Sequence, residues 1–199
     1  MAESYRIIKS PTEGFYKEKG SKFLAFAYQV NSLDEVKEKL EVLKKEYYDA
    51  RHHCYAHLIN DGHQQLIRAN DDGEPNHSAG DPILGQIRSF ELVNTLVVVV
   101  RYFGGTKLGV SGLVHAYKTA AEEALRMAEI EVIEIKQAFK VEYGYEKTSD
   151  VMRIVNDFGV EITSQEFLEI CTLFGRIEPE LFEALKDKLA LAEVIVRKL

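Results

Sequence analysis

The feature that constrains this fold most is a run of four valines at positions 97–100, followed by Arg101 and a glycine-rich loop. Consecutive β-branched residues favour a strand that is buried on both faces of its sheet. Glycines follow at positions 104, 105, 109 and 112. Glycine permits backbone conformations that are closed to other residues and lets a ligand approach the main chain closely. The stretch therefore predicts a central strand that ends at a site or at a tight turn.

The loop after this strand has the composition of an anion-binding site. Arg101 and Lys107 bracket it with positive charge, and a helix is predicted to follow at 111–128. Unpaired N–H groups and the helix dipole attract anions at a helix N-terminus. The loop matches neither the P-loop pattern nor GxGxxG, so the interpretation that the glycines serve only a tight turn stays open. The residues predicted to bind an anionic ligand are Arg101, Tyr102, Gly104, Gly105, Lys107 and Gly109.

Composition limits the classes of partner. The 199 residues are 46% apolar and 29% charged, which is typical of a globular protein. The net charge of −7 gives no overall attraction to nucleic acid or to an anionic membrane, so such binding needs a local basic patch. Cys54 and Cys171 match no CxxC spacing, which indicates a reduced, cytoplasmic location. No apolar run reaches the length of a membrane span, and we expect no membrane partner.

Periodicity predicts the elements of the N-terminal part. Ser32 and Glu35 form a capping-box pattern that begins a helix at 33–47. Asp61-Gly62 is a hairpin-turn signal between strands at 52–59 and 65–69. Asp81 is predicted to be the N-cap of a short helix, with Pro82 at its first position. The apolar face of the helix at 111–128 is predicted to carry Leu113, Tyr117, Ala120, Ala121, Ala124 and Leu125.

Past residue 135 the order of predicted elements is βαββαβ. The strands are predicted at 138–145, 160–165, 170–177 and 192–197, and the helices at 147–158 and 179–189. This order is that of a ferredoxin-like split βαβ unit. No linker rich in Pro, Gly or Ser separates it from the preceding chain. We therefore predict an α+β protein with domains at 1–135 and 136–199.

Two further groups of residues could do chemistry. Adjacent carboxylates at 71–74, among them Asp72 and Glu74, repel each other until a cation or a proton joins them, although a solvated turn would use the same residues. His52 beside Arg51 could serve as an acid-base group because its ordinary pKa lies near neutrality. Six histidines and Cys54 suggest zinc, but no HExxH or paired CxxC is present. We predict no metal and no cofactor.

Several motifs resemble those of the IMPACT family, and more closely its bacterial YigZ-like branch. They are Gly-Ser-Lys-Phe at 20–23, Asp-Ala-Arg-His-His-Cys-Tyr-Ala at 49–56, Asp-Asp-Gly-Glu-Pro at 71–75, Ala-Gly-Asp-Pro-Ile-Leu at 79–84, Arg-Tyr-Phe-Gly-Gly-Thr-Lys-Leu-Gly at 101–109, Gly-Leu-Val at 112–114 and Ala-Tyr at 116–117. The resemblance implies an N-terminal domain like the second domain of ribosomal protein S5. It also implies that the C-terminal unit resembles a ferredoxin-like domain of elongation factor G.

The chain departs from the family pattern in three places. Asn76-His77-Ser78 replaces the usual Ser-Gly-Thr, and Val110-Ser111 replaces Thr-Gly. His115 replaces the usual arginine, which exchanges a permanent cation for a titratable group. A phosphate contact made by that arginine elsewhere in the family is therefore not expected here.

The resemblance also implies a function. Eukaryotic members restrain a starvation-responsive translation kinase through a ribosome-associated partner, and a nucleic-acid or translation-linked role is inferred for bacterial members. We therefore expect a cytoplasmic binding or regulatory protein whose partners are RNA or ribosome-associated proteins. The alternative is an enzyme that acts on a phosphorylated or other anionic small molecule bound at the glycine loop. Residues 138–199 hold 8 Lys and Arg against 12 Asp and Glu, which favours protein docking over an RNA platform there.

The most specific prediction concerns one cleft. Arg101, Lys107, Asp72 and Glu74 are predicted to converge beside the N-terminus of the helix at 111–128. The acidic loop would balance the positive potential until an anionic ligand competes with it. An ion-pair network that only braces these loops would bring the same four residues together.

Overall fold

The computed structural model describes residues 4–60 and 64–199. The chain divides into two compact units. Residues 5–133 form the N-terminal unit, and residues 134–199, with Ser4, form the C-terminal unit. Each unit has its own hydrophobic core and is described by itself.

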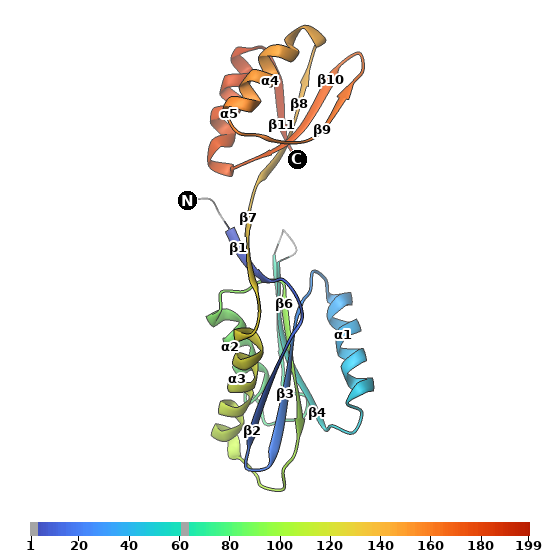
Figure 1. The fold of residues 1–199 in the computed structure, drawn as a ribbon, viewed down its shortest axis with the longest axis vertical. Helices are drawn as coiled ribbons and strands as arrows, with labels where there is room; N and C mark the ends of the chain where they lie inside the picture. Colours follow the sequence, from blue (N-terminus) through green and yellow to red (C-terminus); the bar gives the residue numbers. More distant parts are fainter. Residues whose placement is uncertain (1–3, 61–63) are drawn as a thin grey trace. The chain divides into compact units, whose positions relative to one another are not determined.

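The N-terminal unit is built on a five-stranded sheet (Figure 1). Every neighbouring pair in this sheet is antiparallel. A separate two-stranded sheet pairs β1 with β7. In spatial order the five strands are β2 (Thr12–Glu18), β3 (Ser21–Gln29), β6 (Thr95–Tyr102), β4 (His52–Asn60) and β5 (Gln65–Asn70), and the separate pair is β1 (Ser4–Ile8) and β7 (Ile130–Glu134).

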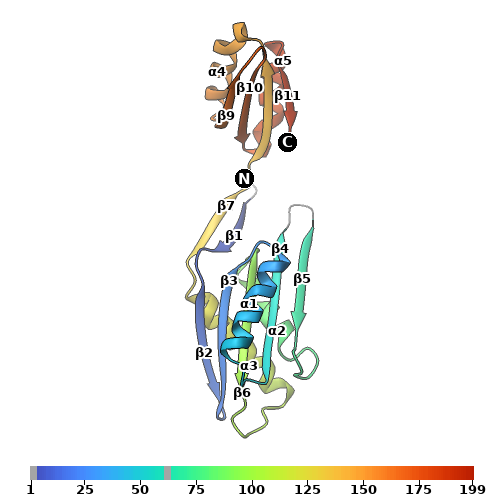
Figure 2. The same ribbon diagram turned by 90° about the vertical axis from the view of Figure 1, so that its right-hand side faces the viewer.

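Helices cover both faces of the five-stranded sheet (Figure 2). Helix α1 (Leu33–Glu46) lies on one face, and α2 (Gly80–Ser89) and α3 (Gly109–Arg126) lie on the other. All four valines of the run are fully buried. Val97 and Val99 join the core beneath α2 and α3, while Val98 and Val100 join the core beneath α1. The predicted strand with two buried faces is therefore confirmed.

The helix starts test the predicted caps. The Ser32 side chain accepts the N–H of Glu35, as predicted for α1. Helix α2 instead begins at Gly80 with Ala79 as its N-cap, so the assignment of Asp81 as the N-cap is wrong. The reason is that the Asp71 carboxylate accepts the N–H groups of both Ala79 and Gly80, at 2.9 Å each. A distant loop residue therefore caps this helix.

Helix α3 begins at Gly109, two residues earlier than predicted. Gly112 consequently belongs to the helix and not to the loop, and it does not adopt a positive φ. The six residues predicted for its apolar face are all buried. Strands β4 and β5 pair antiparallel as predicted, while the Asp61-Gly62 turn between them lies outside the described residues.

The C-terminal unit has the predicted element order βαββαβ. Its four strands are antiparallel throughout, in the order β11-β8-β10-β9. Both helices share one core with this sheet. The elements are β8 (Gln137–Tyr143), a single 3-10 turn at Tyr145–Lys147, α4 (Thr148–Asp157), β9 (Glu161–Phe167), β10 (Cys171–Ile177), α5 (Pro179–Leu191) and β11 (Ile195–Lys198). Over both units, no helix of the described residues is long and apolar enough to cross a membrane.

Candidate functional site

A cavity of about 480 Å³ lies at the N-terminal end of α3. Strand ends and loops supply its polar side chains, because Arg101 ends β6, His52 begins β4 and Glu74 lies in the loop between β5 and α2. Lys107 comes from the loop that precedes α3. The lining residues are Arg51, His52, Glu74, Pro75, Arg101, Phe103, Lys107, Leu108, Gly109, Val110 and Leu113.

Arg101 and Glu74 form a buried ion pair at the base of this cavity. Arg101 Nη1 donates to Glu74 Oε1, and the two side chains are only 7% and 4% exposed. The guanidinium carbon lies 5.5 Å from the ring centre of Phe23 and 5.7 Å from that of Phe103. Aromatic faces attract cations, so both rings add to the stabilisation of the buried charge. Arg101 Nε is buried and has no hydrogen-bond partner in the part of the chain that the structure describes.

Tyr117 and Cys54 extend this pair into a buried network. The Tyr117 hydroxyl donates to Glu74 Oε1 at 2.9 Å. The Cys54 sulfur lies 3.3 Å from Tyr117 Oη and 3.0 Å from the backbone oxygen of Asp71. Burial raises the pKa of the Cys54 thiol and of the Tyr117 hydroxyl, so both groups remain protonated at neutral pH. Tyr117 therefore contributes a polar bond as well as an apolar ring.

His52 is held in one tautomer. Its Nδ1 lies 2.8 Å from the backbone oxygen of Asp72. A carbonyl oxygen can only accept, so Nδ1 carries a proton and the neutral ring has Nε2 as its acceptor. Nε2 lies 4.0 Å from Glu74 Oε1. The ring is thereby oriented with Nε2 toward the buried carboxylate of a cavity that both residues line.

Other predicted residues lie elsewhere. The Asp72 carboxylate accepts the N–H of His53 at 2.7 Å, and Asp72 is not among the residues that line the cavity. Tyr102 donates to Asp49 Oδ1 at 2.7 Å; that bond and burial raise the pKa of Tyr102 to about 12. Gly104 and Gly105 are not lining residues. Gly104 is needed for close packing, since an added Cβ would lie 1.9 Å from the carbonyl carbon of Gly20.

Positive charge prevails at the mouth of the cavity. Arg51 and Lys107 are exposed, and Glu74, already paired with Arg101, is the one acidic residue of the lining. The first turn of α3 holds no acidic residue, and Leu108 offers no side-chain cap. Among the described residues, the first N–H groups of α3 have no side-chain cap, which is the arrangement that favours an anion.

Within residues 4–60 and 64–199, no group of three or more His, Cys, Asp or Glu side chains is placed to hold a metal ion. Four residues that the sequence singled out, Arg101, Glu74, Lys107 and His52, line this one cavity. The sequence did not single out the hydroxyl of Tyr117. The signal available was one tyrosine on a helix face that otherwise carries alanine and leucine.

Comparison with known proteins gives consistent matches. Residues 19–125 match the Impact N-terminal domain. An IMPACT family member of Haemophilus influenzae is 33% identical over 190 residues, which cover 95% of this chain and 92% of that protein. The family member YigZ of Escherichia coli is 38% identical over 126 residues, or 62% of this chain and 61% of that protein. A crystal structure titled as that of a hypothetical protein superposes with a TM-score of 0.70 at 25% identity, covering 100% of this chain and 98% of the other.

Proposed function

Because the chain belongs to the IMPACT family, with relatives in its YigZ-like branch, we propose that it is a two-domain binding protein linked to translation. Residues 1–135 are proposed to be a domain like the second domain of ribosomal protein S5. Residues 136–199 are proposed to be a ferredoxin-like domain, which the strand order β11-β8-β10-β9 with two helices in its core supports. The buried, unpaired cysteines are compatible with the cytoplasmic location expected from the sequence.

The observation that carries the proposal is the cation-rich mouth of the cavity at α3. A chain with a net charge of −7 needs a local positive site to bind RNA, and Arg51, Lys107 and the uncapped helix end supply one. We propose that this mouth binds phosphate groups of structured RNA. The buried Arg101 holds the shape of the site, because its charge is already matched by Glu74.

The C-terminal unit is proposed to dock a ribosome-associated protein. Residues 138–199 carry a net charge of −4, from 8 basic and 12 acidic residues, which opposes contact with phosphates. Its β9–β10 connection exposes Leu168 and Ile170, and apolar side chains at a loop tip suit a protein surface.

The RNA proposal is tested by filter binding of a structured RNA hairpin to the full chain at 50 and 200 mM salt. With two phosphates contacted, we expect affinity to fall about tenfold between these conditions. The double variant Arg51→Ala/Lys107→Ala should bind more weakly and lose most of the salt dependence. A matched double variant of exposed lysines, Lys45→Ala/Lys118→Ala, should behave as the parent. Absence of binding at 50 mM salt, or equal loss in both double variants, would refute the proposal.

A second candidate function is an enzyme that acts on a phosphorylated or other anionic small molecule. The fixed tautomer of His52 favours it, since an oriented acceptor nitrogen beside an anion site can take a proton from a bound substrate. A thermal-shift screen with inorganic phosphate, nucleotides and sugar phosphates tests this function. We expect that a ligand which raises the melting temperature of the parent no longer does so in Lys107→Ala. We also expect that His52→Asn no longer converts this ligand to product. If no anion raises the melting temperature, the enzyme has no substrate at this cavity.

A further inference from the structure

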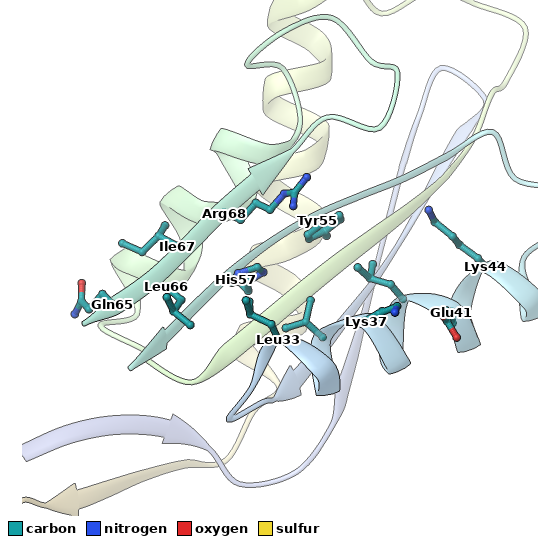
Figure 3. Close-up of a pocket in the computed structure, with 12 residues that line it drawn as sticks. Leu33, Lys37, Glu41, Lys44, Tyr55, His57, Gln65, Leu66, Ile67 and Arg68 are labelled. Carbon is teal, nitrogen blue, oxygen red and sulfur yellow. The ribbon is translucent and has the colours of Figure 1, made fainter. Parts of the chain in front are cut away.

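A second and larger hollow, of about 710 Å³, lies on the opposite face of the N-terminal sheet (Figure 3). One wall is a single face of α1, and the floor is formed by the β4–β5 hairpin. We call this hollow the α1–β5 groove. Its lining residues are Leu33, Val36, Lys37, Leu40, Glu41, Lys44, Tyr55, His57, Gln65, Leu66, Ile67 and Arg68.

The groove runs beside an open edge of the sheet. β5 is the last strand in the order β2-β3-β6-β4-β5, and among the described residues no strand pairs with its outer edge. Such an edge presents a row of unpaired N–H and C=O groups. An extended segment that adds to this edge would direct alternate side chains to the α1 face of the sheet, where the groove lies.

The charge around the groove selects the ligand. Lys37, Lys44 and Arg68 are exposed at its rim against one acidic residue, Glu41. None of the three cations has an ion-pair partner within the residues that the structure describes. In a chain of net charge −7, three exposed cations beside apolar lining residues favour a ligand with carboxylates as well as apolar side chains.

His57 supplies a further, buried polar atom. The residue is 3% exposed, and Nδ1 has no hydrogen-bond partner among the described residues. Burial and then the nearby Arg68 lower the pKa of His57, so the ring is neutral at physiological pH. An unpaired buried nitrogen is costly unless another group bonds to it. His57 therefore adds a neutral, buried polar side chain to the lining of the α1–β5 groove.

We propose that the α1–β5 groove binds an extended acidic segment of a partner protein, which adds to β5 as a sixth strand. Apolar side chains of the segment contact Leu40 and Leu66, and its carboxylates pair with Lys37 and Arg68. The open edge favours a peptide over a single-stranded nucleic acid, because only a peptide completes the N–H and C=O ladder of β5. This site lies on the other face of the sheet from the Arg101 cavity and does not depend on the function of that cavity.

The first test selects ligands without assuming their sequence. The full chain is immobilised, and a random twelve-residue peptide library displayed on phage is selected against it. We expect enriched sequences in which an Asp or Glu stands two positions from an apolar β-branched or aromatic residue, so that both side chains face α1. The synthetic peptides should bind with micromolar affinity by fluorescence anisotropy. Arg68→Glu and Lys37→Glu should each weaken binding at least tenfold, whereas the exposed-lysine control Lys118→Glu should not. Circular dichroism and melting curves verify that all variants are folded.

The second test addresses strand addition itself. Two versions of the best peptide are made with N-methyl groups on the backbone nitrogens of alternate residues. One version carries them on the odd-numbered residues and the other on the even-numbered residues, so that each blocks the N–H groups of one edge of the extended peptide. Pairing with β5 requires that one version loses binding and the other retains it. The proposal is overturned if no acidic peptide is enriched, if Arg68→Glu leaves binding unchanged, or if both methylated versions bind. It is also overturned if a single-stranded RNA binds more tightly than every selected peptide and its binding is weakened by Arg68→Glu to the same extent.

Discussion

Cations lie on both faces of the N-terminal sheet, and Arg101 on one face differs from Lys37 and Arg68 on the other in being buried and paired. Beneath α2 and α3, Arg101 is buried, lies against two aromatic rings and pairs with Glu74, which also accepts a hydrogen bond from Tyr117. On the α1 face, Lys37 and Arg68 are exposed, and neither has an ion-pair partner in the described residues. A buried, matched charge fixes structure, whereas an exposed, unmatched charge is available to a ligand. Substitution of a buried, paired charge should therefore lower the stability of the fold, whereas substitution of an exposed, unpaired charge should weaken ligand binding.

The largest expected effect is that of Glu74→Ala. The change leaves Arg101 buried without its counterion, and breaking a buried pair in this way costs about 3–5 kcal/mol. We expect this loss in the free energy of unfolding measured by urea denaturation. The control Glu38→Ala, at an exposed position of α1, should remain within about 0.5 kcal/mol of the parent.

The double variant Glu74→Leu/Arg101→Met sharpens the same test. Replacing both members of a buried pair by apolar residues is often neutral or stabilising, so much of the lost stability should return. A loss below about 1 kcal/mol in Glu74→Ala would show that water already solvates Arg101, and the contrast between the faces would fail.

Tyr117→Phe should have the next largest effect. The ring is kept, but Glu74 loses a hydrogen bond from a neutral donor inside the core, which costs about 2 kcal/mol. Urea denaturation measures the loss, and Tyr48→Phe, whose side chain is 83% exposed, is the matched control. Equal behaviour of the two variants would mean that the hydroxyl serves no structural purpose.

The limits of sequence reasoning follow the same division. The valine run and the face of α3 were predictable because burial on these elements is a local, periodic property. The Tyr117 hydroxyl was not, because periodicity treats tyrosine only as an apolar residue. Asp71 and Asp72 are adjacent and look equivalent in the sequence, yet one caps α2 and the other accepts the N–H of His53. Loop conformation decides which carboxylate reaches which partner, and no local pattern encodes it.

Asp71→Ala tests the distant cap of α2. Burial raises the pKa of Asp71, but bonds from the N–H groups of Gly80, His77 and Ala79 outweigh it and leave the pKa lowered. When the pKa of a carboxyl group is lower in the folded than in the unfolded state, the ionised group stabilises the fold at every pH above the pKa of the unfolded state. This stabilisation is lost as the pH falls through the pKa of the folded state.

We therefore expect Asp71→Ala to cost about 1–2 kcal/mol at pH 7, as for loss of a helix cap. The difference from the parent should shrink as the pH falls below about 4, near the ordinary pKa of the side chain. Urea denaturation at several pH values measures it, with the exposed Asp187→Ala as control. A difference that grows toward acid would contradict the assigned role.

The smallest effects on stability should come from the cations that we assign to ligands. Lys107→Ala and Arg68→Ala remove exposed charges without an ion-pair partner among the described residues, so each should lie within about 0.5 kcal/mol of the parent by urea denaturation. Arg101→Ala is the contrast, because it leaves Glu74 buried and unpaired and should cost about 3–5 kcal/mol.

The effects on ligand binding should be large for the same exposed cations whose substitution leaves stability almost unchanged. Lys107→Ala should weaken RNA binding and leave peptide binding unchanged, while Arg68→Ala should do the opposite. If Lys107→Ala instead destabilised the fold as much as Arg101→Ala does, the mouth of the cavity would be part of the buried network, and its cations would be bracing loops.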